Sequence, residues 1–111
     1  MRSDADVLQG TLDLLVLHIL SGGKQHGWGV AQVLKTRSED RLVVTQGSLY
    51  PALHRLEKEG WIESEWGVSE NNRRAKYYCL SKSGKRQLER ETERWRRYSA
   101  GVDLVLSGAS P

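Results

Sequence analysis

The chain has 111 residues, a mass of 12.6 kDa and a net charge of +3, which suit a single domain and permit a polyanionic partner without requiring one. Its 38% hydrophobic and 28% charged residues argue against a disordered tail and against a membrane protein. Cys79 is the only cysteine, which excludes an intramolecular disulfide and a cysteine-rich zinc site, so we expect a protein of the reducing cytoplasm.

The first predicted helix runs from Val7 to Leu20 and is apolar on two sides. One face, expected to pack in the domain core, is formed by Leu8, Leu12, Leu15, Val16 and Ile19. Val7, Leu14 and Leu17 fall on the opposite side, and a helix that is apolar on two sides must be covered on both. We therefore predict a subunit interface on the second face; the alternative is that the domain itself covers the whole helix.

Two more helices follow. The second is predicted over residues 27–37, after a glycine pair that ends the first helix, and its inward face is expected to hold Trp28, Ala31 and Leu34. The third is predicted to begin near Gly47 or Ser48, with Thr45 or Ser48 as its N-cap, and to stop at Gly60. Its inner side carries Leu49, Ala52, Leu53 and Leu56.

The next segment changes from helical to alternating periodicity. Residues 62–66 and 76–80 alternate in the manner of strands, and residues 67–74 would form the loop of a hairpin between them. The sequence thus predicts a mainly α fold with one small β-hairpin.

A long final helix is predicted over residues 82–106, with Ser81 as its N-cap. Leu88, Trp95 and Val102 recur every seven residues along it, which is typical of a helix that packs against another helix. Residues 107–111 are expected to be a frayed tail.

Three helices, a hairpin and a final helix are the order of a winged helix-turn-helix, in which the third helix enters the DNA major groove. The outer side of that helix carries hydroxyls, an imidazole and two cations, which suit phosphates and base edges: Gly47, Ser48, Tyr50, Pro51, His54, Arg55 and Lys58. The hairpin tip adds Asn72, Arg73 and Arg74 where a wing should lie. The alternative for the helix is a solvated amphipathic surface.

Four segments resemble the PadR family of bacterial transcriptional regulators: residues 12–20, 26–30, 46–62 and 76–84. The stretch from Gly47 to Ile62 is the most specific of them. Trp28 stands where the family commonly has tyrosine, and Ser81 where it commonly has threonine. The resemblance implies a homodimeric winged-helix protein that binds operator DNA, usually as a repressor, and is released by a small molecule or another signal. The single C-terminal helix is similar to that of the compact subgroup.

These observations assign residues 1–81 to a DNA-binding winged helix-turn-helix domain and residues 82–106 to a dimerisation helix in the same compact unit. The predicted DNA-binding residues are Ser48, Tyr50, His54, Arg55, Lys58, Asn72, Arg73 and Arg74. Of these, we expect His54 and Arg55 to read base edges and the hydroxyl groups to contact phosphates. The partner of this surface would be an inverted-repeat operator in double-stranded DNA.

The predicted dimer interface consists of Leu14, Leu17, Leu88, Trp95, Tyr98 and Val102. The final helix would lie against the first helix of the other subunit. Trp95 is expected to be an anchor of this interface, because large aromatic side chains supply much of the burial at such contacts. An alternative is that Trp95 and its symmetry mate border a pocket for a flat aromatic effector.

Other classes of function lack the residues they need. No phosphate-binding glycine loop or activated nucleophile is visible, so we predict no enzymatic activity and no cofactor. His18, His26 and His54 lie on different elements, which makes a metal site improbable. The rival interpretation is a winged-helix adaptor that binds protein and not DNA. Arg55, Lys58, Arg73 and Arg74 argue against it, since an adaptor surface more often carries apolar anchors.

Overall fold

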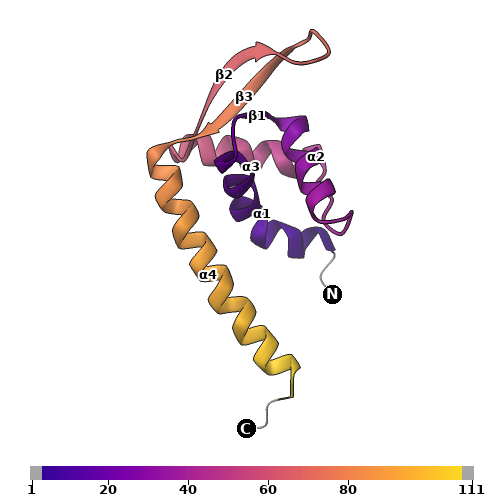
Figure 1. The fold of residues 1–111 in the computed structure, drawn as a ribbon, viewed down its shortest axis with the longest axis vertical. Helices are drawn as coiled ribbons and strands as arrows, with labels where there is room; N and C mark the ends of the chain where they lie inside the picture. The colour runs from indigo at the N-terminus through magenta and orange to yellow at the C-terminus, as the bar shows by residue number, and fades with distance from the viewer. Residues whose placement is uncertain (1–3, 109–111) are drawn as a thin grey trace.

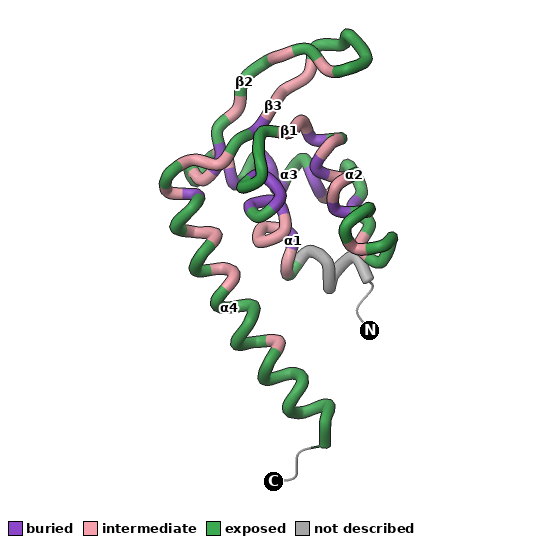
Figure 2. Tube along the Cα trace, viewed as in Figure 1, coloured by how far each residue is buried: buried purple, intermediate pink, exposed green. Residues whose placement is uncertain are grey.

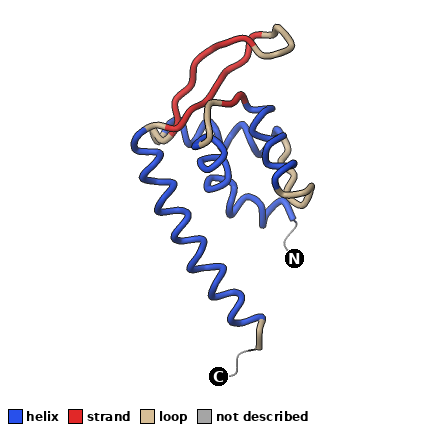
Figure 3. The backbone as a smooth tube through the Cα atoms, viewed as in Figure 1, coloured by secondary structure: helices blue, strands red, loops and turns tan. Residues whose placement is uncertain are grey.

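The structure, a computed structural model, describes residues 4–108, with side chains from residue 10 onward. This part of the chain contains four helices and three strands. In chain order they are α1 (Asp4–Ser21), β1 (Gln25–His26), α2 (Gly27–Arg37), α3 (Gln46–Lys58), β2 (Ile62–Val68), β3 (Arg74–Leu80) and α4 (Lys82–Leu106) (Figure 1). Figure 3 shows the hairpin of β2 and β3 projecting beyond the helices. The prediction of a mainly α winged helix-turn-helix is confirmed.

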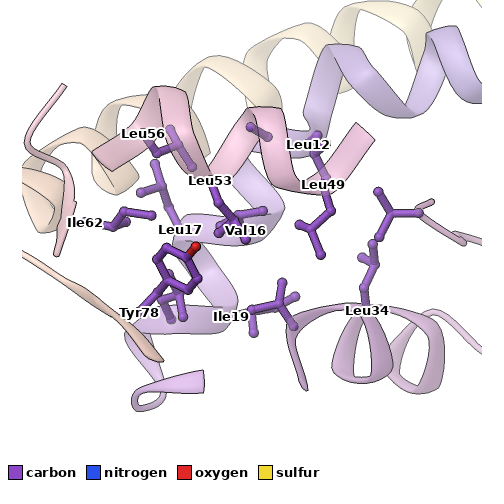
Figure 4. Close-up of a cluster of buried hydrophobic side chains, with 14 residues drawn as sticks. Leu12, Val16, Leu17, Ile19, Leu34, Leu49, Leu53, Leu56, Ile62 and Tyr78 are labelled. Carbon is purple, nitrogen blue, oxygen red and sulfur yellow. The ribbon is translucent and has the colours of Figure 1, made fainter. Parts of the chain in front are cut away.

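The core is built around α1. Its buried side chains meet those of α2, α3 and the sheet, as Figure 4 shows. The fully or almost fully buried residues are Leu12, Val16, Leu17, Ile19, Leu20, Val30, Leu34, Val44, Leu49, Ala52, Leu53, Leu56, Ile62 and Tyr78. The inner face predicted for the third helix is therefore confirmed.

The prediction that Leu17 lies at a subunit interface is wrong. Its side chain is 0% exposed and belongs to the core of its own domain. The reason is that α2 and α3 pack against α1 while β3 and α4 also contact it, so the chain itself covers both sides of the helix. Leu14 is half-buried, and the side chain of Val7 lies outside the described residues.

Both ends of α3 are fixed by local hydrogen bonds. At the start, the Thr45 hydroxyl accepts a bond from the Ser48 amide at 3.2 Å, as an N-cap does. At the end, the Gly60 amide donates to the Glu57 carbonyl and the Trp61 amide donates to the Leu56 carbonyl. These two bonds make a Schellman motif, which requires the positive φ of 79° that Gly60 adopts.

The sheet has the strand order β1, β3, β2, with both pairings antiparallel. Ile62 pairs with Leu80 at one end of the hairpin and Val68 with Arg74 at the other, so the strands extend two residues further toward the tip than predicted. Residues 69–73 form the loop, in which Asn72 has a φ of 59°. Strand β1 is too short to show any periodicity in the sequence.

Helix α4 begins against the domain and then extends away from it (Figure 1). The Ser81 hydroxyl caps it, accepting from the Gly84 amide at 3.0 Å. Leu88 is half-buried and packs against the core, but the residues beyond it are increasingly exposed (Figure 2). Of the predicted tail, Ser107 and Gly108 form a turn, and residues 109–111 lie outside the described part.

The first turn of α4 packs so closely on the backbone of Trp61 that Gly84 admits no side chain. A Cβ atom at this position would overlap the Trp61 carbonyl oxygen, a backbone atom that cannot move aside. We predict that Gly84→Ala lowers the free energy of unfolding by about 3 kcal/mol, the upper range for overpacking. Urea denaturation followed by circular dichroism measures it.

Gly101 is the matched control in the same helix. A Cβ atom there has no neighbour within 4 Å, so Gly101→Ala should stabilise the protein by about 0.5–1 kcal/mol through helix propensity. Equal effects of the two substitutions would contradict the packing of α4 on Trp61.

Candidate nucleic-acid interface

The outer face of α3 is accessible along its whole length. Gly47, Pro51, His54 and Lys58 are all exposed on the side opposite the core. His54 and Lys58 are separated by one helical turn, so they lie above one another on this face. An imidazole and an ammonium group are thus presented together to solvent in the part of the chain that the structure describes.

Arg55 lies at the edge of this face and already has a partner. Its guanidinium forms an ion pair with Asp13 on α1, while the Arg55 side chain remains 54% exposed. The pair ties α3 to α1, the central helix of the core. Asp13 would therefore compete with the base contact that the sequence predicts for Arg55.

The hydroxyl side chains at the start of α3 are partly engaged within the domain. Ser48 is half-buried, and its hydroxyl accepts a bond from that of Thr45 at 3.2 Å. Tyr50 is 46% exposed, and its ring lies against the first residue of α2, Gly27, where an added Cβ atom would be 3.0 Å from the ring. Gly27 therefore provides the space that Tyr50 occupies.

The wing carries its cations at and beside the loop. Arg73 is exposed, and the Arg74 guanidinium lies 4.4 Å from the centre of the Trp66 ring across the hairpin, in a cation–π contact. Within the loop, the Asn72 amide donates to Ser69 at 2.9 Å and the Ser69 amide donates to Arg73 at 2.8 Å. These bonds give the exposed tip a defined turn.

A polar cluster connects α3 to both strands of the wing. The Ser64 hydroxyl of β2 donates to the Glu57 carboxylate of α3, and the Lys76 ammonium of β3 lies 3.4 Å from the same group. The Ser64 bond first, and Lys76 after it, hold the pKa of Glu57 below its ordinary value of 4.5, although burial opposes this shift. The ionised carboxylate therefore fixes α3 relative to the wing.

The prediction that Trp28 faces inward is wrong. Its side chain is 57% exposed, because Gly27, Val30 and Leu34 supply the buried face of α2. The helix is capped by His26, whose Nδ1 accepts from the Gly29 amide at 2.9 Å. Trp28 is instead part of the wall of a cavity.

That cavity, of about 810 Å³, lies between the start of α2, Tyr50 of α3 and the wing. Trp66, which is 60% exposed, lines it from the hairpin, and Tyr78 lines it from β3. The sequence did not indicate this cavity, because its walls come from segments that are distant in the chain.

The far half of α4 presents an apolar surface to solvent. Trp95 is 42% exposed, Tyr98 66% and Val102 37%, and the rings of Trp95 and Tyr98 contact each other with centres 6.0 Å apart. Trp95, Tyr98 and Val102 thus form an exposed apolar seam on α4, at positions predicted for a dimer interface.

Two further classes of site find no support among residues 4–108. No group of three or more histidine, cysteine or acidic residues among the described side chains, which begin at residue 10, could hold a metal ion. Nor is any helix within residues 4–108 long and apolar enough to cross a membrane.

An amphipathic third helix beside a cationic hairpin defines the class of winged-helix DNA-binding regulators. Residues 16–90 match the model of the transcriptional regulator PadR-like family. The chain therefore belongs to the PadR family, whose members are DNA-binding transcriptional regulators and not enzymes.

Individual relatives agree in fold and extent. A PadR-like transcriptional regulator from Bacillus cereus is 31% identical, with a TM-score of 0.79 over 93% of this chain and 98% of that one. A transcriptional regulator from Clostridium thermocellum is 28% identical, with a TM-score of 0.80 over 88% of this chain and 95% of the other. A Lysinibacillus sphaericus protein is 26% identical over 104 residues, which cover 94% of this chain and 95% of its own length.

The structure adds residues to this surface that sequence reasoning missed. Asp13 was not among the predicted site residues, because its partner Arg55 is 42 positions away in the sequence. Glu57 likewise gave no sign of its contacts with Ser64 and Lys76, since no local pattern connects a helix to the strands that follow it.

The Glu57 cluster predicts a pH-dependent stability. Because the folded state lowers the pKa of Glu57 below 4.5, the ionised group stabilises the fold above that pH, and this contribution is lost as the pH falls through the lowered pKa. Glu57→Gln should therefore lower the free energy of unfolding by about 1 kcal/mol near neutral pH. The difference from the parent should shrink in urea titrations performed below pH 4.5.

Glu59→Gln, at the exposed end of the same helix, is the control and should follow the parent at each pH. A Glu57→Gln deficit that is constant with pH would mean that the ionised carboxylate does not stabilise the fold.

Proposed function

We propose that the protein is a homodimeric transcriptional repressor that binds an inverted-repeat operator through α3 and the wing. The observation that carries this proposal is the separation of two exposed surfaces. His54 and Lys58 on α3, with Arg73 on the wing, are cationic or polar and exposed, whereas the seam at Trp95 and Tyr98 on α4 is apolar and exposed. The first surface suits a polyanion and the second suits a partner helix.

A second copy of this chain is the partner that the α4 seam fits. Monomeric soluble proteins rarely leave contiguous large apolar side chains uncovered. In a two-fold dimer the same surface serves both subunits, so the Trp95 region of one α4 could cover the corresponding region of the other. The half-buried Leu14 and Leu88 would lie at the margin of this interface, which would place the helices of the two subunits side by side.

The dimer sets the arrangement of the operator. Two-fold symmetry requires half-sites separated by about one helical turn, roughly 10 base pairs, or a multiple, because the two α3 helices must face the same side of the duplex. Each wing would then contact the duplex beside its own α3.

Within a half-site, the residues divide by their reach. His54 lies near the centre of the exposed face of α3 and is the best placed to contact base edges. Ser48, Tyr50 and Lys58 suit phosphates, as do Asn72, Arg73 and Arg74 on the wing. Arg55 would exchange Asp13 for DNA, so part of its contact energy would offset the lost ion pair.

The effector of this proposal would bind between the two α4 helices, beside Trp95. Aromatic walls with few polar groups are typical of small-molecule sites, and both Trp95 and Tyr98 would supply them from each subunit. Such a ligand would change the angle between the two α4 helices and thereby the separation of the two α3 helices.

Substitutions on α3 and the wing should affect DNA binding differently. His54→Ala is expected to cost about 1–3 kcal/mol on the preferred duplex and to flatten discrimination at one base position. Arg73→Ala should weaken binding to all sequences and reduce the slope of log affinity against log salt by about one unit. Both effects are measured by titrating the protein, at several salt concentrations, against the genomic DNA fragments that it retains and against scrambled duplexes.

Arg86→Ala, which removes an exposed cation from α4, is the control and should bind both duplexes as the parent does. If the His54 and Arg73 variants also bound every duplex as tightly as the parent, α3 and the wing would not be the DNA surface. The adaptor interpretation would then replace the proposal.

Trp95→Ala tests the dimer. Removing an interface aromatic should weaken dimerisation by about 3 kcal/mol, measured by sedimentation equilibrium. Arg96→Ala, an exposed neighbour on α4, should leave the dimer dissociation constant unchanged. An unaltered constant in the Trp95 variant would place this side chain outside the interface.

A further inference from the structure

The cavity between α2, α3 and the wing is a feature distinct from the α4 seam. It measures about 810 Å³, within the range of about 300–1,000 Å³ that is usual for small-molecule sites. Its lining comes from the start of α2, from Tyr50 of α3 and from the hairpin, so one subunit forms it alone. An effector held between two α4 helices would not occupy it.

Two tryptophans line this cavity and remain largely uncovered. Trp28 is 57% exposed and Trp66 is 60% exposed, although tryptophan side chains are on average highly buried. The Trp28 ring is tilted against the His26 ring with centres 6.2 Å apart, which leaves most of the indole open. A flat aromatic group in the cavity would cover an indole face and remove apolar surface from water.

The charge of the lining is positive and is concentrated on the hairpin. Its cations are Arg73, Arg74 and Lys76, and its acid is Glu70. Lys76 is paired with Glu57 at 3.4 Å. Arg73 and Arg74, in contrast, form no ion pair with an acid in the part of the chain that the structure describes. These two guanidinium groups are therefore available to an anion.

A pair of guanidinium groups favours a phosphate monoester over a carboxylate. Each guanidinium presents a planar fork of donors that matches two oxygens of a phosphate. A phosphate monoester carries about 1.5 to 2 negative charges at neutral pH and three terminal oxygens, so it can engage both arginines at once. Tyr50 and the first residues of α2, Gly27 and Trp28, add a hydroxyl donor and the positive end of a helix dipole to the lining.

We infer that this cavity binds a free nucleoside monophosphate, with the base against Trp28 and the phosphate on Arg73 and Arg74. Such a ligand joins the two groups that the lining favours, a flat aromatic ring and a phosphate monoester. Tyr50, Arg73 and Arg74 also belong to the proposed DNA surface, so a bound nucleotide would exclude the duplex from the same subunit. This competition rests on the proposed function, whereas the nucleotide site does not. The nucleotide would thus release DNA with no change in the packing of the α4 helices.

Isothermal titration calorimetry of the full-length protein with AMP, GMP, CMP and UMP, without DNA, tests the site. At least one of these nucleotides should bind saturably with one molecule per chain. The matching nucleoside and inorganic phosphate each lack half of the ligand and should bind at least about tenfold more weakly. Trp28→Ala and Arg73→Ala, which truncate exposed side chains, should each weaken nucleotide binding about tenfold.

Two control variants separate this site from other surfaces. Gln32→Ala changes an exposed residue of α2 outside the lining, and Trp95→Ala changes the α4 seam. Both should bind the nucleotide as the parent does.

A second measurement tests the competition with DNA. The nucleotide, at about ten times its own dissociation constant, should weaken binding of the duplex that the protein selects from a random pool by about tenfold or more. In Trp28→Ala the same nucleotide concentration should leave the affinity for the duplex nearly unchanged.

Several results would overturn the inference. If none of the four nucleotides bound saturably, or if the Trp28 and Arg73 variants bound them as the parent does, the cavity would not be a nucleotide site, and the proposed function would stand. Inorganic phosphate bound as tightly as the nucleotide would reduce the site to an unspecific anion surface, and benzoate bound as tightly would contradict the recognition of phosphate. A nucleotide that binds without weakening the duplex complex would contradict the competition. Nucleotide binding by a parent that selects no duplex would confirm the site and contradict the proposed function, and with it the competition.

Discussion

The burial of α1 from two sides is the constraint on which the rest of the structure depends. Leu17 and Val16, which are adjacent on the helix, are both almost completely buried within a single chain. With α2, α3, β3 and the first part of α4 all resting on this helix, their relative positions are set by one core. The domain therefore presents α3 on a base whose central helix is packed from several sides.

Polar contacts then fix the proposed DNA-binding surface more finely than the core alone could. Asp13 holds Arg55 on one flank of α3, while Ser64 and Lys76 hold Glu57 on the other. Both contacts are made by side chains on the rim of the core, where they cost little desolvation. They leave the middle of the exposed face, at His54, open to solvent, and they couple α3 to the wing.

The two ends of the molecule have opposite chemistry, which suits the two roles proposed for them. Cations and hydrogen-bond donors gather at the wing and at the starts of α2 and α3, whereas exposed aromatic and aliphatic side chains gather on the second half of α4. Because the first turn of α4 packs at Gly84 against Trp61, the direction of the helix is fixed at its base. Any change in how two α4 helices pack would therefore move the attached α3 helices.

The sequence by itself determined every element whose signal is local. Periodicity located the helices and the hairpin, the caps at Thr45 and Ser81 and the glycine at Gly60 set their ends, and the motif from Gly47 to Ile62 indicated the family. Only the tertiary structure decided which apolar side chains are buried and which charged side chains pair. The burial of Leu17, the exposure of Trp28 and the ion pair of Arg55 each depend on segments far away in the chain. A helix that is apolar on two sides looks the same in sequence whether its own chain or a second subunit covers it, and only the packing of the remaining elements distinguishes the two.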